Sequence, residues 1–312
     1  MNSSPPHPVV SAVVVSYHTG PVLESSLRAL LEAPEILEIR LVDNGNPEAV
    51  AARLDAWAAR EARLVVVRPG RNLGFAAGCN RGAEGARGAY IALVNPDLIV
   101  SPGMFARLLE TFRRRPDAWI GGARLLDPDG GEQRGGRRET LTPWRALVEI
   151  TRLWALFPHH PYFAAFNLHR QGEERGVVEV PTLSGAFMFL PREAWHRLGG
   201  MDEGYFLHVE DIDLCLRAHK AGGTILYCGD AEARHHRGSS DASVIRVEWH
   251  KTRGLVRYFW KHFRDAYPPW VLALATIALW GRYVAALPWR LWADGARLWH
   301  RGRGEGSGRA GG

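Results

Sequence analysis

Short apolar runs alternate with amphipathic stretches through the first third of the chain. The run Val9–Ser16 is almost continuously apolar and β-branched, which is typical of a strand buried on both faces. Further elements are predicted from the same kind of pattern: strands at Ile36–Val42, Leu64–Val67 and Tyr90–Val94, and helices at Val22–Glu32, Pro47–Ala59, Gly74–Glu84 and Gly103–Arg113. Strands that alternate with helices of about ten residues indicate βαβ units and a mainly parallel sheet.

Polar residues follow the ends of these predicted strands, where parallel sheets bind their ligands. The groups are Ser16-Tyr17-His18, Asp43-Asn44-Gly45-Asn46 and Asn95-Pro96-Asp97, with the Gly- and Asn-containing segment Asn72–Gly82 between them. Each group alone is compatible with an ordinary turn, since Asp, Asn and Gly favour turns for backbone reasons. Their occurrence at successive strand ends favours a ligand site.

The second half of the chain contains a group of carboxylates at a predicted helix start. A strand is expected at Thr182–Leu190 and a short helix at Pro191–Leu198, before the Gly-rich turn 199–204. Glu210, Asp211 and Asp213 then open a helical pattern. Capping and dipole complementarity explain one or two of these carboxylates, while the whole group also suits a general base on a rigid element. After a strand at Thr224–Cys228 comes the pair His235-His236.

The pattern weakens between residues 121 and 179. The segment Asp127–Thr140 is rich in Gly and Arg and is expected to be a mobile loop. Its arginines, Arg138 among them, are candidates for phosphate contacts, and a solvated loop is the equal alternative. The aromatic segment Thr151–Arg175 is a candidate lid or acceptor wall. Its histidines have no metal-ligand spacing.

Composition and charge separate the end of the chain from its body. The chain has 312 residues, of which 46% are hydrophobic, and this excludes disordered, collagen-like and simple coiled-coil classes. From residue 245 onward the chain has twelve Lys and Arg and four Asp and Glu, which gives this part a net charge of +8. The whole chain has a net charge of +6, so the residues before 245 have a net charge of −2. Seven of the twelve Trp also lie there. A basic, Trp-rich end indicates a membrane surface or an anionic partner, and the basic charge is not spread over the whole protein as a nucleic-acid footprint would be.

The C-terminal pattern predicts two helices. Residues 247–263 interleave cations with aromatic residues, and a Pro-Pro break precedes a second helix at Trp270–Trp292. The uncharged run Ala266–Gly281 falls short of the roughly 18 residues of a spanning helix, although a crossing that includes Arg282 stays open. The charged residues of this helix share one arc, which favours an interfacial helix, with a helix packed on the body as the alternative. They are Arg282, Arg290, Asp294, Arg297 and Arg301. Arg301–Gly312 is expected to be disordered.

Cysteine use and the N-terminus favour a cytosolic setting. The three cysteines, Cys79, Cys215 and Cys228, are far apart and form no C-x-x-C pair, so neither a disulfide framework nor a cysteine zinc site is expected. The first eight residues do not have the pattern of a signal peptide.

Taken in order, these motifs resemble family 2 glycosyltransferases with the GT-A fold, close to bacterial rhamnosyltransferase-type members. The resemblance runs roughly from Val9 to Ser240. It implies a GT-A catalytic domain, an α/β fold with a mainly parallel central sheet flanked by helices, over residues 1–245. Residues 246–312 would form a helical, membrane-associating extension. The matching motifs are Ser16-Tyr17, Val42-Asp43-Asn44-Gly45, Asn72-x-Gly74-Phe75 with Gly78 and Asn80, Asn95-Pro96-Asp97, Ser184-Gly185-Ala186, Gly199-Gly200-Met201-Asp202-Glu203, Glu210-Asp211-x-Asp213-Leu214 and His235-x-x-Gly238-x-Ser240.

The family's pattern implies a role for each matching residue. Asp43 would accept a hydrogen bond from the nucleotide base. Asp97 would bind a divalent metal, Mg²⁺ or Mn²⁺, with His235 as an additional ligand and His236 as the next choice. Asn95 stands where the family often has a second Asp, and its neutral amide lowers the expected metal affinity. The implied nucleotide-sugar site comprises Ser16, Tyr17, Asp43, Asn72, Gly74, Asn80, Asn95 and Asp97.

Asp211 would be the general base that deprotonates the acceptor hydroxyl, so that attack inverts the anomeric carbon. Acceptor or accessory roles are expected for Glu210, Asp213, Asp202 and Arg138. The implied enzyme takes a sugar from a nucleotide-diphosphate donor, with dTDP-rhamnose as the implied donor, to a membrane-linked or cell-envelope glycan, for example one carried on polyprenyl diphosphate. It would work in the cytoplasm, peripheral or monotopic at the inner membrane face.

Three alternatives stay open at this point. One, of the same class, is a transferase that uses a UDP-hexose on another cell-envelope acceptor. A catalytically silent nucleotide-binding scaffold at the membrane is favoured by Asn95 and disfavoured by Asp97, Asp211 and His235. A Rossmann oxidoreductase lacks support because no G-x-G-x-x-G follows the first strand.

Overall fold

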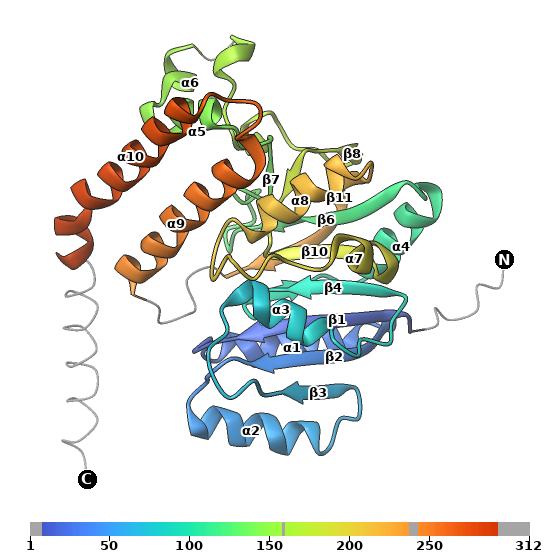
Figure 1. Ribbon diagram of the computed structural model, residues 1–312. Coiled ribbons are helices and arrows are strands. Elements are labelled where there is room, and N and C mark those ends of the chain that lie inside the picture. Colours follow the sequence, from blue (N-terminus) through green and yellow to red (C-terminus); the bar gives the residue numbers. More distant parts are fainter. Residues whose placement is uncertain (1–7, 158–159, 237–242, 293–312) are drawn as a thin grey trace. The chain divides into compact units, whose positions relative to one another are not determined.

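The computed structural model describes residues 8–157, 160–236 and 243–292. The chain divides into two compact units (Figure 1): residues 1–206 with 210–241, and residues 207–209 with 242–312. The helix α9 (Val244–Phe263) opens the long part of the second unit, close to the boundary predicted at residue 245. The predicted disorder of 301–312 and the implied positions Gly238 and Ser240 lie outside the described residues.

A nine-stranded mixed sheet forms the centre of the first unit. Its order is β3-β2-β1-β4-β10-β6-β11-β5, and β8 pairs with β11 at one side. The pairs among β1, β2, β3 and β4 are parallel, as is β6 with β11, whereas β10, β5 and β8 pair antiparallel. The strands are β1 (Val10–Ser16), β2 (Ile36–Asp43), β3 (Leu64–Val67), β4 (Tyr90–Val94), β5 (Leu98–Val100), β6 (Ala118–Leu126), β8 (Val177–Glu179), β10 (Phe187–Pro191) and β11 (Thr224–His235).

Helices cover both faces of this sheet, because alternate residues of each buried strand point to opposite sides. In β1, Val10, Ala12 and Val14 face the core that α1 (Val22–Glu32), α2 (Glu48–Ala58) and α4 (Met104–Arg114) complete. Val13 and Val15 face the second core. That core contains side chains of α3 (Phe75–Ala83), α7 (Arg192–Leu198) and α8 (Glu210–Lys220).

The helix α3 approaches β1 closely because two of its residues are glycines. A Cβ on Gly82 would lie 2.3 Å from a methyl carbon of Val13, and one on Gly78 would lie 2.8 Å from a methyl carbon of Val15. Neither position has room for a side chain. Gly78 and Gly82 therefore allow α3 to pack directly against β1, the strand that ends at Ser16.

The strands and helices predicted in the first third are present, and their ends differ from the prediction by at most one residue. The segment predicted as one strand at Thr182–Leu190 is instead β9 (Thr182–Leu183) and β10, separated by Ser184-Gly185-Ala186. The predicted loop at Asp127–Thr140 contains β7 (Arg137–Arg138), which pairs with β9. The rest of this region holds α5 (Pro143–Thr151), α6 (Leu153–Leu156) and the 3₁₀ turns Pro161–Phe163 and Leu168–Arg170.

The second unit contains α9 and α10 (Pro269–Ala285). Within it, Glu248 of α9 pairs with Arg282 and Arg290, at 3.4 and 3.1 Å between side-chain N and O. Arg290 is buried. The prediction that Arg290 points into anionic headgroups is therefore wrong, because its side chain is buried against Glu248. The side chain of Arg282 is 37% exposed, and its contact with headgroups stays a prediction. Asp294, Arg297 and Arg301 lie outside the described residues. In the part of the chain that the structure describes, no helix is both long and apolar enough to cross a membrane.

Candidate active site

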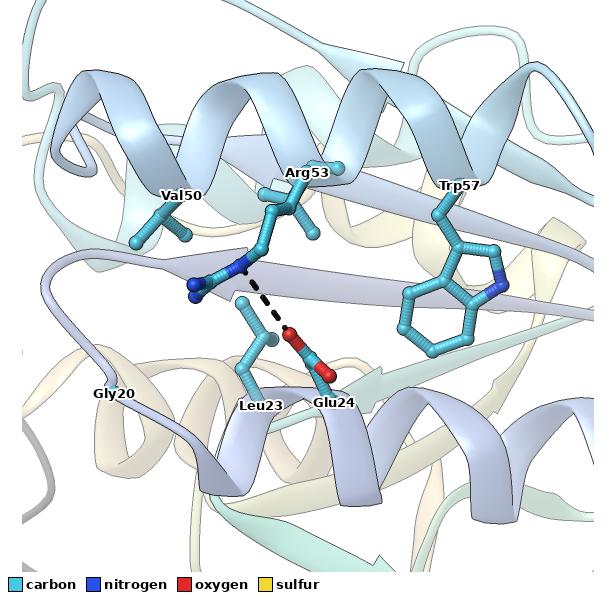
Figure 2. Close-up of a pocket in the computed structure, with 7 residues that line it drawn as sticks. Gly20, Leu23, Glu24, Val50, Arg53 and Trp57 are labelled. Atoms are coloured by element: carbon cyan, nitrogen blue, oxygen red, sulfur yellow. Dashed lines mark ion pairs between the residues drawn. The ribbon is translucent and has the colours of Figure 1, made fainter.

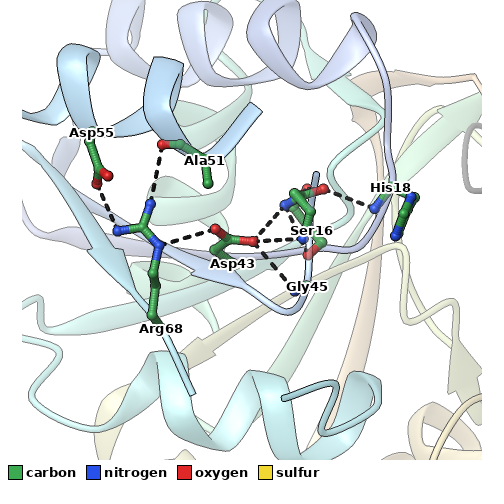
Figure 3. A network of polar contacts seen from close by, with 8 residues as sticks. Ser16, His18, Asp43, Gly45, Ala51, Asp55 and Arg68 are labelled. Carbon is green, nitrogen blue, oxygen red and sulfur yellow. Dashed lines mark hydrogen bonds and ion pairs between the residues drawn. The ribbon is translucent and has the colours of Figure 1, made fainter. Parts of the chain in front are cut away.

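The ends of β1 and β2 are joined by a hydrogen-bond network around Asp43 (Figure 3). Asp43 Oδ1 accepts from the backbone N and from Nδ2 of Asn46, at 2.9 and 3.0 Å. Asn46 Nδ2 also donates to Ser16 Oγ at 3.0 Å. Asp43 is buried and holds the turn 43–46 in place. Its expected hydrogen bond to a nucleotide base stays a prediction, and in the structure both of its oxygens have partners within the protein.

Arg68 is a member of this network that the sequence analysis did not identify. Its Nε lies 3.2 Å from Asp43 Oδ2, and its Nη1 donates to Asp55 at 2.7 Å. Asp55 is the main cause of a raised Arg68 pKa. The signal was present in the sequence, because Arg68 directly follows the strand Leu64–Val67 in the same way that Asp43 ends its own strand. Tyr17 lies beside Gly45, with a ring carbon 3.5 Å from where a Cβ would be.

Asn72 and Asn44 together fix the approach to α3. Asn44 Nδ2 donates to Asn72 Oδ1 at 2.9 Å, and the same oxygen accepts from Gly74 N at 2.9 Å. Asn44 Oδ1 accepts from Leu73 N. These bonds place the backbone of 72–74 beside the end of β2. The sequence prediction that this segment and the Asp43 turn belong to one site is consistent with this geometry.

Asn80 has a structural role on the opposite side of α3. Its Oδ1 accepts from Met201 N and its Nδ2 donates to Met201 O and to Glu203, each at 2.9 Å. The amide thus fixes the Gly-rich turn 199–204 against α3. Asp202 in that turn accepts from Gly204 N at 2.8 Å. Contacts of Asn80 with a nucleoside and of Asp202 with an acceptor stay predictions.

Asn95, Asp97 and His235 lie together just beyond the end of β4. His235 Nε2 lies 3.1 Å from Asp97 Oδ1 and 3.3 Å from Asn95 Nδ2. The antiparallel pairing of β11 with β5 brings this His to the turn, since His235 is opposite Leu98. His236 is fixed at the same edge by its backbone N–H, which donates to Asp97 O. Of the two histidines named from the sequence, His235 is the one whose ring faces Asp97.

Asp97 and His235 fit a divalent metal as a two-ligand site. Both are buried, and they present one carboxylate and one imidazole to the same space. Mg²⁺ and Mn²⁺ commonly use one or two protein ligands and complete their shell with substrate phosphates and water. A site that binds the metal through protein ligands alone would need a larger group of ligating side chains. Among the residues that the structure describes, no three His, Cys, Asp or Glu are grouped so as to hold an ion.

Asp211 lies at the first turn of α8 and accepts hydrogen bonds from one guanidinium and two backbone N–H groups. Its Oδ2 accepts from Arg138 Nη2 at 2.5 Å and from Gly185 N at 2.9 Å, and its Oδ1 accepts from Ile212 N at 2.8 Å. Burial alone raises the pKa of Asp211, but the charge and hydrogen bond of Arg138 and the two backbone N–H groups outweigh burial and hold that pKa below its ordinary value. The carboxylate is thus ionised at neutral pH.

One short segment connects Asp211 to the Asn95 turn. Gly185 N donates to Asp211, and the next residue, Ala186, accepts from Asn95 N at 2.9 Å. The segment Ser184-Gly185-Ala186 therefore brings the base position of α8 and the Asp97 turn to one place. A Cβ on Gly185 would lie 3.0 Å from Asp211 Cβ.

Asp213, for which an acceptor or accessory role is expected from the sequence, points into the protein interior. The side chain is fully buried, and it accepts from Tyr205 Oη at 3.1 Å and from Arg217 Nε at 2.7 Å. Arg217 in turn donates to the carbonyl groups of Leu198 and Gly200. Asp213 thus anchors the start of α8 to the Gly-rich turn, and its acceptor or accessory role stays a prediction. Glu210 is also buried, and its expected accessory role stays a prediction.

A small pocket lies between α1 and α2 (Figure 2). An ion pair between Arg53 and Glu24, at 3.5 Å, crosses it. None of the candidate site residues lines this pocket. It is a gap between two helices on one face of the sheet, and the polar site described above lies elsewhere.

Comparison with known proteins identifies the family of this chain. The family model described as "Glycosyltransferase like family 2" matches residues 5–254. The chain belongs to this family. This glycosyltransferase is 31% identical, over 74% of its own length and 77% of the relative's, to N-acetylglucosaminyl-diphospho-decaprenol L-rhamnosyltransferase of Mycobacterium tuberculosis (strain CDC 1551 / Oshkosh). It is 36% identical, over 65% of its length and 62% of the relative's, to the uncharacterized glycosyltransferase EpsJ of Bacillus subtilis (strain 168).

Solved structures with the same fold are GT-A glycosyltransferases. The chain matches GalNAc-T7, solved with UDP, GalNAc and Mn²⁺, with a TM-score of 0.60 and 17% identity over 83% of this chain and 49% of that one. It matches the mannosyltransferase PcManGT from Pyrobaculum calidifontis, solved with GDP-Man and Mn²⁺, with a TM-score of 0.55 and 17% identity over 100% of this chain and 79% of that one. The GT-A fold expected for this glycosyltransferase is confirmed.

Proposed function

We propose that this glycosyltransferase moves a sugar from a nucleotide-diphosphate donor to a glycan hydroxyl with inversion. One observation carries the proposal: Gly185 and Ala186 bind Asp211 and the Asn95 turn at once. A general base and an anion-stabilising site must lie on either side of the reacting carbon for an in-line displacement. The loop brings two such groups to one edge of the sheet.

Each part of the site has a distinct task in this reaction. The turns after β1 and β2 and the segment 72–74 form the nucleoside side. A divalent ion bound at Asp97 and His235 would neutralise charge on the diphosphate leaving group. Asp211 takes the proton of the acceptor hydroxyl as the oxygen attacks the anomeric carbon opposite the diphosphate. Asp211 Oδ1, which accepts one hydrogen bond from Ile212 N, has a lone pair for that proton.

The relatives support a donor and an acceptor class. The mycobacterial relative is named as an L-rhamnosyltransferase acting on N-acetylglucosaminyl-diphospho-decaprenol. We infer dTDP-rhamnose as donor and a polyprenyl-diphosphate-linked or other cell-envelope glycan as acceptor. A UDP-hexose donor is the second candidate, since the relative solved with UDP has the same fold.

We propose further that the second unit binds an anionic membrane surface from the cytoplasmic side, through an apolar stripe on α10. Trp270, Leu274, Ile277 and Val284 are all exposed and recur at spacings of three, four and seven residues, so they share one helix face. Leu272, Leu279 and Tyr283 are buried on other sides of the same helix. An exposed apolar helix face with Trp near its end is typical of interfacial helices.

A panel of nucleotide sugars tests the proposal with purified protein. Each donor is mixed with Mg²⁺ or Mn²⁺ and a lipid-linked N-acetylglucosamine acceptor, and transfer and donor hydrolysis are followed with and without a chelator. Turnover of dTDP-rhamnose with inverted product supports the full proposal, and turnover of a UDP-hexose supports the second donor. Nucleotide binding without transfer or hydrolysis of any donor contradicts the enzyme and favours a silent nucleotide-binding scaffold.

A further inference from the structure

Gln133 connects the predicted metal ligand His235 to a carboxylate outside the donor site. It lies in the segment that the sequence suggested to be a mobile loop, yet its side chain is only 2% exposed. Its backbone N–H donates to Leu125 O at 2.8 Å, which holds the segment against the end of β6. A buried amide in a fixed backbone has few ways to satisfy its hydrogen bonds, so its orientation can be deduced.

The hydrogen-bond partners of Gln133 determine the positions of the oxygen and the nitrogen of its side-chain amide. Nε2 lies 2.6 Å from Asp127 Oδ1 and 3.4 Å from the carbonyl oxygen of His235. A carboxylate and a carbonyl can only accept, so the donating NH₂ must be at this end. The other end, Oε1, lies 2.7 Å from His235 Nδ1. Because an amide oxygen only accepts, Nδ1 must bear a hydrogen.

This hydrogen decides what the other ring nitrogen can do. In a neutral imidazole with its proton on Nδ1, Nε2 has the lone pair. Asn95 Nδ2, 3.3 Å away, is placed to donate to that lone pair, and Asp97 Oδ1 lies 3.1 Å from the same nitrogen. The imidazole and the carboxylate thus both direct electron pairs into one small space, which is the arrangement that a bound cation stabilises.

We infer that Gln133, oriented by Asp127, is a positioning residue that sets the tautomer of His235 so that Nε2 can bind a divalent cation together with Asp97. The inference rests on the proposed function, which assigns the metal to Asp97 and His235. Outer hydrogen-bond partners of ligating histidines fix the ring and its tautomer, and their loss typically weakens metal binding about 10- to 100-fold.

Gln133→Met tests the inference, because Met has a similar volume but cannot accept the Nδ1 hydrogen. The matched control is Gln171→Met, at an exposed position. The tautomer of His235 is measured at pH 8 by long-range ¹H–¹⁵N correlation on metal-free, ¹⁵N-His-labelled protein, with the resonance assigned from a His235→Asn variant. We expect the Nδ1–H form in the wild type and in Gln171→Met, and a shift toward Nε2–H in Gln133→Met.

Mn²⁺ affinity is measured on the same proteins by electron paramagnetic resonance, with Mn²⁺ alone and with dTDP or UDP. The expected loss in Gln133→Met is about 10- to 100-fold. The double variant Asp127→Asn/Gln133→Glu exchanges donor and acceptor, keeps an acceptor on Nδ1, and should restore both the tautomer and the affinity. The inference is overturned if the wild type holds the Nε2–H form or binds no Mn²⁺, or if Gln133→Met leaves both readouts unchanged. Neither measurement needs sugar transfer, so absent turnover would contradict the proposed function and leave these results standing.

Discussion

The guanidinium of Arg138 and the carboxylate of Asp211 form an ion pair, with Nη2 and Oδ2 2.5 Å apart. The same Nη2 also lies 2.5 Å from the carbonyl oxygen of Leu183, and the guanidinium lies over the ring of Phe166. Arg138 is fixed by the pairing of β7 with β9. The pair keeps a largely buried carboxylate ionised, which a general base at neutral pH requires.

Arg138→Gln should therefore change the pH dependence of transfer. The pKa of Asp211 is lower in the folded state than in the unfolded state, where it is about 3.9. Ionised Asp211 therefore stabilises the fold above that pH, and this contribution is lost as the pH falls through the folded-state pKa. Without Arg138, burial is no longer outweighed and the pKa rises. We expect the acid limb of the kcat profile to move to higher pH.

The control for this variant is Arg134→Gln, an exposed arginine in the same segment. The groups facing Asp211 are Arg138, the N–H groups of Gly185 and Ile212, and Cys215 one turn along α8. An unchanged acid limb in Arg138→Gln, with activity retained, would show that the ion pair does not tune the base.

Asp211→Asn should abolish transfer and leave donor binding nearly intact. An amide cannot take the acceptor proton, and loss of a general base typically costs about 10²- to 10⁴-fold in rate. The residue contacts Gly185, Ile212 and Arg138 and none of the turns assigned to the nucleoside. Initial rates and calorimetric titration with the donor nucleotide measure the two effects. A large loss of nucleotide affinity would instead assign Asp211 a structural role.

Asp213→Asn should act on stability and not on chemistry. Its carboxylate is fully buried between Tyr205 and Arg217, and removing one partner of a buried ion pair costs about 3 kcal/mol. Urea unfolding should show this loss of free energy, while kcat of the folded fraction stays close to that of the wild type. If kcat falls as far as in Asp211→Asn while the free energy of unfolding is unchanged, that result would support the acceptor role expected from the sequence.

Gly74→Ala should destabilise the first unit more than Gly70→Ala. Both glycines have a positive φ, +83° and +76°, which costs a residue with a Cβ at least about 1 kcal/mol. With ψ at −179°, Gly74 also lies in a backbone region that is essentially restricted to glycine. A Cβ at Gly74 would also lie 2.3 Å from the carbonyl oxygen of Phe206, whereas one at Gly70 meets nothing within 4 Å. The extra loss in Gly74→Ala, measured by urea unfolding, should exceed about 1 kcal/mol. An equal loss of unfolding free energy in the two variants would show that neither the backbone conformation of Gly74 nor its closeness to Phe206 adds to the cost of the Cβ.

The sequence predicted the positions of the site better than its contacts. Apolar runs locate strand ends, and this was enough to bring Asp43 and Asp97 to the sheet edge. The pairs Arg138–Asp211 and Gln133–His235 join residues 73 and 102 positions apart. The first pair depends on the pairing of β7 with β9, and the second depends on the position of β11 beside β5. No local sequence pattern contains that information.

Asp213 shows a second limit, which concerns the direction of a side chain. Three carboxylates at a helix start all satisfy the same dipole and capping preferences, so their sequence does not separate them. In the folded chain Asp211 lies at the loop Ser184–Ala186, whereas Asp213, two residues on, faces the interior. Arg290 shows the same limit, because it is buried and pairs with Glu248 of α9, which the spacing of charges along its own helix does not reveal.

Replacing Trp270 and Ile277 by Ser should release the protein from membranes. Both side chains are about two-thirds exposed on the same face of α10, and burying each apolar side chain contributes roughly 1.5–3 kcal/mol. We expect binding to vesicles of phosphatidylcholine and phosphatidylglycerol, measured by co-sedimentation, to fall at least tenfold. Val177→Ser, at an exposed apolar position of β8, is the control and should bind as the wild type does. If the double variant still binds but about 0.5 M NaCl removes it, the attachment is electrostatic and the apolar stripe is not the membrane face.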